Sequence, residues 1–344
     1  MAEIAQSVPL YSTAFEHEWL LNRCNVDWDS TNKLLLAEIR GTYELQHQGY
    51  ATKTGPLPPV EFSRWGEIAP AEDAFATKPY PVITIVDGPF TYKDDPSRAS
   101  WHANFADAEL FRYCTGYMFA QDEHQVAEHP ALAHMRTALR TIDHGVHLRT
   151  AVRALTSEIA TPCLIANVPR RLHVDTTMPG IYGNGFARAT REMVCKAVRV
   201  MDPVPLSNIF AMKAPSPCDT DSRYLPETLG SILRTAHTTF SAVVSASSAL
   251  FGAKPTVVHT GAWGCGAFGG SVAVMARLQF LAALTAGVDE IVFHAFTPGQ
   301  RRVAELARDF IVGLPGKLVA APKVSSVLEM VNSEAYTWGS GDGN

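Results

Sequence analysis

From Pro81 onward, short β-branched runs alternate with longer helix-like stretches, and this alternation is the strongest constraint on the fold. Residues with the pattern of buried strands occupy 81–88, 163–168, 198–201, 256–260 and 291–296. Helix-like stretches cover 130–139, 148–157, 185–194, 228–251, 271–286 and 298–312. This alternation is typical of a mostly parallel or mixed sheet with helices on both faces. We therefore expect an α/β fold whose ligands bind beyond the carboxyl ends of the strands.

The first 80 residues lack this alternation. A helix-like stretch over 32–48 is followed by a segment rich in Gly and Pro, residues 52–70, which reads as a loop. We therefore expect residues 1–80 to form an accessory N-terminal segment, 81–320 the main domain and 321–344 a C-terminal tail.

Charge and cysteine usage exclude several classes of protein. The net charge is −5 and no long basic tract occurs, which argues against a nucleic-acid-binding protein. No apolar run approaches the roughly 18 residues of a membrane helix, and no basic residue precedes Arg23, as a signal peptide would require. The six cysteines form no CxxC pair, and His144 and His147 lack further ligands at suitable spacing. We expect a cytoplasmic protein without a metal site or a membrane partner.

A glycine-rich loop lies between the predicted strand 256–260 and the predicted helix 271–286. Its glycines occupy positions 261, 264, 266, 269 and 270. Glycine allows backbone amides to approach a ligand closely, and the following helix adds the positive end of its dipole. The loop therefore predicts a site for a phosphate or diphosphate.

Two known phosphate-binding motifs fit this loop poorly. A P-loop is excluded because no Gly-Lys-Ser/Thr follows. Residues 264–269 satisfy the dinucleotide-binding pattern GxGxxG, and the acidic pair Asp289-Glu290 lies about 20 residues further on. That pair precedes the next strand, however, whereas a ribose-binding acid should follow it. A Rossmann-type NAD oxidoreductase remains the less favoured alternative.

The string WGCGAFGG, residues 263–270, closely resembles the poly(ADP-ribose) glycohydrolases, a macrodomain family that hydrolyses ADP-ribose chains. The resemblance implies a three-layer α/β/α sandwich with a mixed central sheet. It also implies that the backbone of this loop holds the diphosphate of ADP-ribose, that Phe268 packs on the distal ribose and that Phe296 lies near the adenine. The binding residues implied in the loop are Gly264, Cys265, Gly266, Ala267, Phe268 and Gly269.

A second motif of the same family occurs upstream in altered form. Asn104-Phe105-Ala106-Asp107 is followed by Gln121-Asp122-Glu123, and position 121 lies 17 positions after position 104. By resemblance, Glu123 is the catalytic glutamate, Asp122 replaces a second glutamate, and Gln121, Asn104 and Asp107 bind substrate. The Gly-Gly-Gly loop of the family is replaced here by Phe111-Arg112-Tyr113.

The chemistry of glycosidic hydrolysis explains why a buried glutamate suits the role of catalytic acid and base. The leaving oxygen must be protonated, and a carboxylate must then activate water. One glutamate performs both steps if its pKa is raised toward about 6–7. The negative charges of Asp122 and of a diphosphate would both act in that direction. Asp122 and Asn104 would hold the hydroxyls of the distal ribose.

Residues 180–190, GIYGNGFARAT, loosely resemble the family loop that covers the adenine, with Tyr182 and Phe186 as candidates for stacking on the base. A glycine turn with two core aromatic residues explains the same segment equally well. We expect an ADP-ribosyl glycohydrolase without a cofactor. Its substrate would carry ADP-ribose on a protein or small molecule, in preference to a polymer. The alternative from another class is a non-catalytic ADP-ribose-binding protein.

Overall fold

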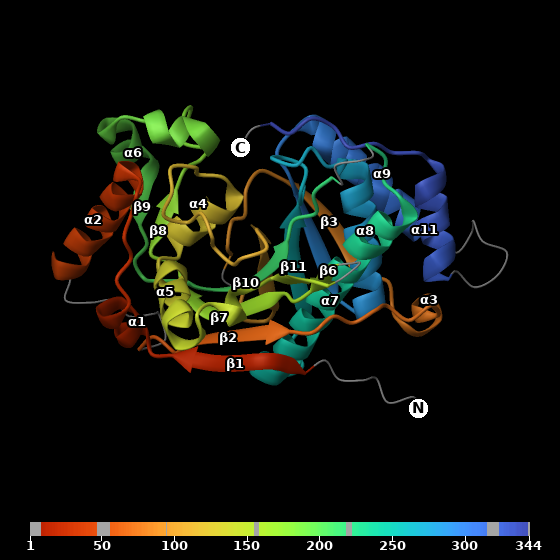
Figure 1. The fold of residues 1–344 in the computed structure, drawn as a ribbon, viewed down its shortest axis with the longest axis horizontal. Coiled ribbons are helices and arrows are strands. Elements are labelled where there is room, and N and C mark those ends of the chain that lie inside the picture. The colour runs from red at the N-terminus through yellow and green to blue at the C-terminus, as the bar shows by residue number, and fades with distance from the viewer. Residues whose placement is uncertain are drawn as a thin grey trace.

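The computed structural model describes residues 8–46, 56–93, 95–154, 158–217, 222–314 and 323–342. An eight-stranded mixed sheet crosses the molecule in the order β1-β2-β7-β10-β4-β11-β12-β3 (Figure 1). Its strands are β1 (Pro9–Phe15), β2 (Val60–Trp65), β3 (Val82–Asp87), β4 (Ala99–Ala106), β7 (Cys163–Pro169), β10 (Leu206–Lys213), β11 (Thr256–Gly261) and β12 (Glu290–Ala295). The five strands from β10 to β3 are parallel, and the pairs β7–β10, β2–β7 and β1–β2 are antiparallel.

Helices cover both faces of this sheet (Figure 1). One face carries α7 (Pro226–Phe251), α8 (Val272–Ala286), α9 (Pro298–Val312) and α11 (Val324–Ser333). The other carries α1 (His17–Arg23), α4 (Gln121–Glu128) and α5 (Ala131–Asp143). Beyond them lie α2 (Thr31–Gln46), α6 (Arg191–Ala197), the 3-10 helix η2 (Gly183–Arg188) and the strand pair β8 (Leu172–Val174) and β9 (Val198–Val200). The remaining short elements are α3 (Ala74–Thr77), η1 (Val146–Leu148), β5 (Ala151–Arg153) and β6 (Glu158–Ala160).

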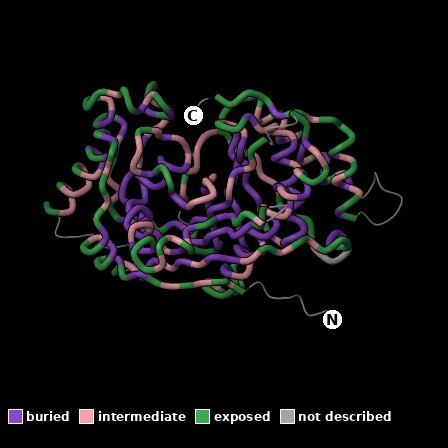
Figure 2. Tube along the Cα trace, viewed as in Figure 1, coloured by how far each residue is buried: buried purple, intermediate pink, exposed green. Residues whose placement is uncertain are grey.

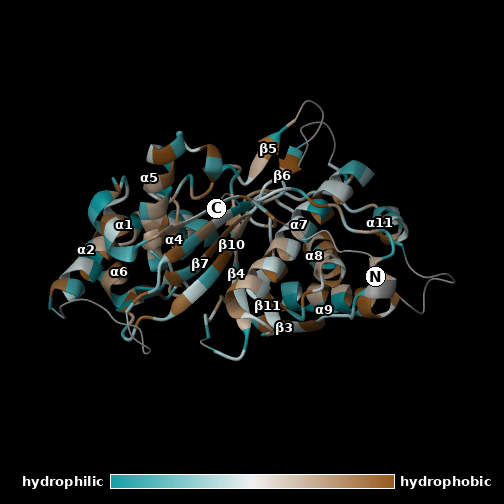
Figure 3. Cartoon of the chain, turned by 90° about the horizontal axis from the view of Figure 1, so that it is seen from below, coloured by the Kyte–Doolittle hydropathy of each residue, from teal (hydrophilic) through white to brown (hydrophobic). Residues whose placement is uncertain are grey.

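The two faces bury separate hydrophobic cores. Trp101, Phe210 and Phe240 belong to the larger core, under α7 and α8. Ile165 and Ile209 belong to the other core, under α5. Buried residues concentrate in the sheet and on the inner sides of the helices (Figure 2), and hydrophobic residues lie along the central strands (Figure 3). The structure thus confirms the expected three-layer α/β fold with a mixed sheet.

Several predicted elements are wrong or incomplete. Residues 148–157 do not form the predicted helix, because η1 and β5 occupy the described part of that span. The predicted strand at 198–201 forms, but as β9 it pairs only with β8 outside the main sheet. The first 80 residues contribute β1 and β2 to the central sheet, and the described part of residues 321–344 begins with α11, which packs against α7. Within the described ranges, no helix is both long enough and apolar enough to cross a membrane.

Candidate active site

The glycine-rich loop and the acidic helix start follow neighbouring parallel strands. β11 leads into the loop 262–271, and the chain after β4 leads to α4. β4 and β11 pair in a register that places His102 opposite His259. Both connections therefore leave the sheet at the same edge, where ligands bind in open α/β sheets.

Close backbone contacts explain the glycines of the loop. Gly264 and Gly269 adopt left-handed backbone conformations, with φ of +71° and +65°. A Cβ at Gly270 would lie 2.7 Å from the Gly264 carbonyl oxygen, so the two ends of the turn touch. The fully buried Trp263 anchors the loop in the larger core. Sequence and packing together fix the path of this backbone.

The loop presents backbone amides that suit an anion. Within the loop, the amides of residues 263, 265, 269 and 270 donate to carbonyls of the same turn. Among the described residues, those of Gly264, Gly266, Ala267 and Phe268 have no backbone acceptor. The 15-residue helix α8 begins directly after the loop and points the positive end of its dipole toward it.

The chain beyond α11 lies along this loop. The Gly339 amide donates to the Gly269 carbonyl at 2.7 Å, and the Asp342 amide donates to the Gly266 carbonyl at 3.3 Å. The Asp342 carboxylate lies beside Gly266, with Oδ2 3.3 Å from the position that a Cβ would take. Figure 1 shows the C-terminus between the two halves of the molecule, above the strand ends. The sequence did not indicate this contact.

Side-chain amides hold the start of α4 against β4. Oε1 of Gln121 accepts from the Phe105 amide at 2.8 Å, and its Nε2 donates to the Ala103 carbonyl at 2.9 Å. The Asn104 Nδ2 donates to Oδ1 of Asp122 at 2.9 Å. The sequence-predicted residues Asn104, Gln121 and Asp122 therefore meet in one buried cluster.

The Glu123 carboxylate closes the first turn of α4, since its Oε2 accepts from the Ala120 amide at 2.9 Å. Asp122 and Glu123 are 7% and 4% exposed. Burial, reinforced by the negative charge of Glu123, raises the pKa of Asp122 to about 7. Burial also raises the pKa of Glu123, and the positive charge of Lys33 opposes this rise. Both carboxyl groups therefore keep their protons to a higher pH than exposed carboxyl groups do, and this direction favours acid catalysis.

Tyr182 lies within electrostatic reach of both parts of the site. Burial of its hydroxyl and the negative charges of Asp342 and Glu123 raise the pKa of Tyr182 to about 12. Its ring nevertheless keeps surface for a ligand, because Tyr182 is 42% exposed. Tyr182 therefore lies near both Asp342, which contacts the glycine loop, and Glu123 at the start of α4.

Of the four aromatic residues predicted to contact ADP-ribose, three are exposed to solvent and one is buried. Phe268 and Phe296 are 37% and 58% exposed, and Tyr182 is also exposed. Phe186 is fully buried and stacks on Phe119, with ring centroids 3.9 Å apart. Phe186 therefore packs in the core beneath the 180–190 segment instead of offering a face to a base, unlike the stacking role predicted for it.

Residues 111–113, which replace the Gly-Gly-Gly loop of the resembled family, contact one another and their neighbours in the chain. Phe111 is fully buried with φ of +53°, and the Arg112 guanidinium lies 5.3 Å from the Tyr113 ring centroid. Asp107 accepts from the Glu109 amide at 3.2 Å and lies 3.8 Å from Arg112. Asp107 therefore makes its contacts within this loop. It also lies near enough to Asp122 to raise the pKa of Asp122.

Three histidines from β4, β11 and β12 form a layer on the sheet face that also carries Asn104, with His102 and His294 buried and His259 half-buried. The rings of His102 and His259 stack at 4.4 Å, and Nδ1 of His259 lies 3.1 Å from Nε2 of His294. Burial lowers the pKa of all three, so the rings are neutral. In the part of the chain that the structure describes, no set of three or more His, Cys, Asp or Glu side chains is arranged to hold a metal ion.

The sequence reasoning missed two residues that contact the acidic cluster or its surroundings. Gln125, one turn after Asp122, accepts from Asn104 at 2.9 Å and donates to the Tyr92 hydroxyl at 3.0 Å. Its spacing from Gln121 on α4 was an available signal. Lys33 comes from the N-terminal segment, and nothing in the sequence connects it with residues 122–123.

Comparisons with known proteins support the resemblance. Residues 184–303 match the family model of poly(ADP-ribose) glycohydrolase, macro domain fold. No curated protein matches the sequence.

Three solved structures illustrate the similarity. Poly(ADP-ribose) glycohydrolase from Thermomonospora curvata is 17% identical, with a TM-score of 0.44, over 81% of this chain and 98% of that chain. Its form bound to the inhibitor ADP-HPD is also 17% identical, with a TM-score of 0.45, over 81% and 99%. The Deinococcus radiodurans enzyme in complex with ADP-ribose is 17% identical, with a TM-score of 0.42, over 70% and 90%. The family match over residues 184–303 confirms the resemblance to the poly(ADP-ribose) glycohydrolase macrodomain family.

Proposed function

We propose that the protein hydrolyses the glycosidic bond of an ADP-ribosylated substrate. The observation that carries the proposal is the convergence of two features at one sheet edge. The amides of Gly264 and residues 266–268 are available to a diphosphate, and the buried Asp122–Glu123 pair begins the helix that follows the adjacent strand. The similarity to poly(ADP-ribose) glycohydrolase and the relatives solved with ADP-ribose or ADP-HPD support the same ligand.

In this proposal Glu123 acts first as an acid. It donates its proton to the leaving oxygen while the bond at the anomeric carbon of the distal ribose breaks. The resulting carboxylate then takes a proton from a water molecule, whose oxygen bonds to the anomeric carbon. Asp122 and Asn104 bind the ribose hydroxyls. Phe268 packs on that ribose, and Tyr182 and Phe296 contact the adenosine end.

The compact segment 111–113 favours a mono-ADP-ribosylated protein or small molecule over a long polymer. Tyr113 is 50% exposed beside the site, and its backbone lacks the close approach that three glycines would permit. We therefore expect faster release of ADP-ribose from a mono-ADP-ribosylated substrate than from poly(ADP-ribose) of equal ADP-ribose content.

Release of ADP-ribose from mono-ADP-ribosylated protein, from poly(ADP-ribose) and from a small ADP-ribosyl conjugate tests the activity. Glu123→Gln should keep ADP-ribose affinity and lower turnover by about 10²–10⁴-fold. Glu192→Gln is the matched control, because Glu192 is an exposed residue of α6 paired with Lys196. Unchanged turnover in Glu123→Gln would remove Glu123 from the mechanism.

A non-catalytic ADP-ribose-binding protein is the second candidate. The shorter Asp122 and the replaced glycines favour it, because both alter the surroundings of the reacting bond. Calorimetric binding of ADP-ribose without release from any of the three substrates would select this function.

Variants of the two aromatic residues in the 180–190 segment should distinguish an effect on ligand binding from an effect on stability. Tyr182→Ala should weaken ADP-ribose binding with little loss of stability, because the ring is partly exposed. Phe186→Ala should cost about 3–5 kcal/mol of stability, as large-to-small changes in a core do. Equal affinities of wild type and Tyr182→Ala would exclude Tyr182 from the binding site.

A further inference from the structure

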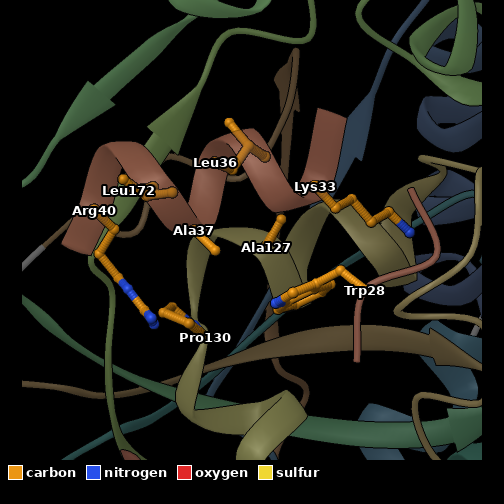
Figure 4. A pocket seen from close by; sticks show the side chains of 8 residues that line it. All are labelled: Trp28, Lys33, Leu36, Ala37, Arg40, Ala127, Pro130 and Leu172. Atoms are coloured by element: carbon orange, nitrogen blue, oxygen red, sulfur yellow. The ribbon is translucent and has the colours of Figure 1, made fainter. Parts of the chain in front are cut away.

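Lys33, on the N-terminal helix α2, is a fully buried lysine with a relative exposure of 1%. Its Nζ donates to the Cys114 carbonyl at 2.9 Å and to the Tyr113 carbonyl at 3.4 Å. Figure 4 shows its nitrogen directed away from the side chains of Leu36 and Arg40, which line the same small pocket between α2 and α4. Lysine is almost never fully buried unless paired, so this position requires an explanation.

The carboxylates around Lys33 supply the missing negative charge. The pKa of Lys33 is lowered to about 8, because the effect of burial exceeds the opposing effect of nearby groups, which raise the pKa. In order of effect, these groups are Glu123, Cys114, Asp122 and Asp29. Lys33 is therefore protonated at neutral pH. A singly protonated Asp122–Glu123 pair together with one ammonium group carries no net charge, which makes burial of all three groups tolerable.

The same end of α2 holds two loops that border the site. The amides of Asp29 and Ser30 donate to the Thr115 carbonyl at 3.2 and 3.1 Å, and the Thr115 hydroxyl donates to Asp29 at 2.9 Å. The Asn32 amide group donates to the Phe186 carbonyl at 2.7 Å and to the Ala189 carbonyl at 3.0 Å. The segment 29–33 thus joins the loop that replaces the family glycines to the aromatic segment 180–190.

We infer that residues 29–33 belong to the active site and that Lys33 is a positioning residue. Lys33 holds the loop 113–115 and supplies the positive charge that balances the Asp122–Glu123 pair. The inference rests on the proposed hydrolysis for its consequence in catalysis, but its electrostatic part concerns the protein alone.

The pH profile of ADP-ribose release tests this role in the folded chain. Without the ammonium group, loss of a proton from the acid pair becomes less favourable. The alkaline limb of Lys33→Met should therefore move up by about one pH unit or more. Displacement of the loop should also lower the rate at neutral pH about tenfold or more. Lys33→Arg retains the charge and should keep the alkaline limb in place. Lys196→Met, which removes an exposed lysine, should match wild type. An unshifted limb in Lys33→Met would overturn the inference.

A second measurement requires neither activity nor a change at Lys33. The pKa of Lys33, followed by NMR of its labelled side chain, should lie near 8 in wild type and should fall in Glu123→Gln. The surface variant Glu192→Gln should leave it unchanged. If wild type releases no ADP-ribose while Lys33 responds to Glu123→Gln, the proposed hydrolysis fails and the charge pairing stands. If Lys33 titrates identically in both proteins, the pairing fails whatever the activity.

An independent observation concerns the C-terminal residues 339–342, which are fitted closely to the glycine loop. A Cβ at Gly341 would collide with the Ala267 carbonyl oxygen, and a Cβ at Gly269 would collide with the Gly339 carbonyl oxygen. Trp338 anchors the segment, because it is 8% exposed and stacks on Tyr224 with ring centroids 4.4 Å apart. Only glycine permits this contact on either side.

We propose that residues 339–342 act as an internal competitor for the anion site, with the Asp342 carboxylate standing beside the loop that the diphosphate requires. Gly341→Ala should displace the segment and raise ADP-ribose affinity several-fold, and Ser340→Ala is the matched control. Unchanged or weaker binding by Gly341→Ala would contradict the competition. In wild type the amides of Gly339 and Asp342 should exchange slowly with solvent. Fast exchange would overturn the proposal even if ADP-ribose does not bind.

Discussion

The buried Glu128–Arg170 ion pair offers the sharpest test of how α4 is held. Glu128 ends α4, the helix that begins with the acidic pair, and its side chain is fully buried. Its two carboxylate oxygens accept from Nε and Nη2 of Arg170 at 2.9 and 3.0 Å. One oxygen also accepts from the Val174 amide at 2.8 Å. His124 and His173 approach the same carboxylate at 3.3 Å.

Arg170→Met removes the permanent positive charge and leaves the carboxylate buried with weaker partners. Breaking a buried ion pair in this way costs about 3–5 kcal/mol, because the buried carboxylate loses its permanently charged partner. The stability of a domain is about 5–15 kcal/mol, so this loss is a large part of the total. The double variant Glu128→Gln, Arg170→Met should lose less than the sum of the single variants, because no charge is then left unpaired.

Urea unfolding at pH 7 measures these differences, with Arg191→Met as the control, since Arg191 forms an exposed ion pair 3.8 Å from Glu38. The control should lose at most about 1 kcal/mol. ADP-ribose affinity measured on the folded fraction reports whether α4 also shifts at its first turn. A loss below about 1 kcal/mol for Arg170→Met would show that Arg170 does not stabilise the buried Glu128 carboxylate, because exposed ion pairs already reach that value.

Two further predictions concern acid stability and the glycine loop. Burial lowers the pKa of His129 and His259 to about 3 and of His294 to about 4. Below about pH 6.5 the unfolded chain therefore binds more protons than the folded chain. The urea concentration at the unfolding midpoint should decrease as the pH is lowered from 6.5 to 4.5, and a constant midpoint would contradict this. Gly269→Ala should lower stability by at least about 1–2 kcal/mol, through its left-handed backbone and because its Cβ would collide with the Gly339 carbonyl. Gly299→Ala, where a Cβ fits, should cost nothing; equal thermal midpoints for the two variants would show that the loop relaxes freely.

The sequence predicted elements whose signals are local. The strand 256–260, the glycine loop and helix 298–312 were recognised because turn glycines, a proline in the first helical turn and a β-branched run each act within a few residues. The Thr297 side chain accepts from the Gln300 amide and marks the start of α9. Such features do not depend on distant parts of the chain.

The missed elements depend on tertiary contacts. β4 carries His102 and Asn104, polar residues that become buried only because α4 and the neighbouring strands supply partners. Its sequence therefore lacks the apolar run typical of a central strand. The helix predicted at 148–157 is wrong because this segment contains β5, which pairs with β6 only a few residues further along the chain. Propensity cannot anticipate such pairing.

The same distinction applies to the candidate site. The motifs at 263–270 and 121–123 identified the two halves, and the structure brings them to neighbouring strands. Lys33 and Asp342 reach the site from opposite ends of the chain, through contacts that only the fold creates.

A crystal structure with ADP-ribose would show whether the glycine loop and Glu123 bind the two ends of one ligand. We expect diphosphate density on the amides of Gly264 and residues 266–268, with residues 339–342 displaced and the anomeric carbon of the distal ribose beside the Glu123 carboxylate. A diphosphate bound elsewhere, or a distal ribose directed away from Glu123, would contradict it.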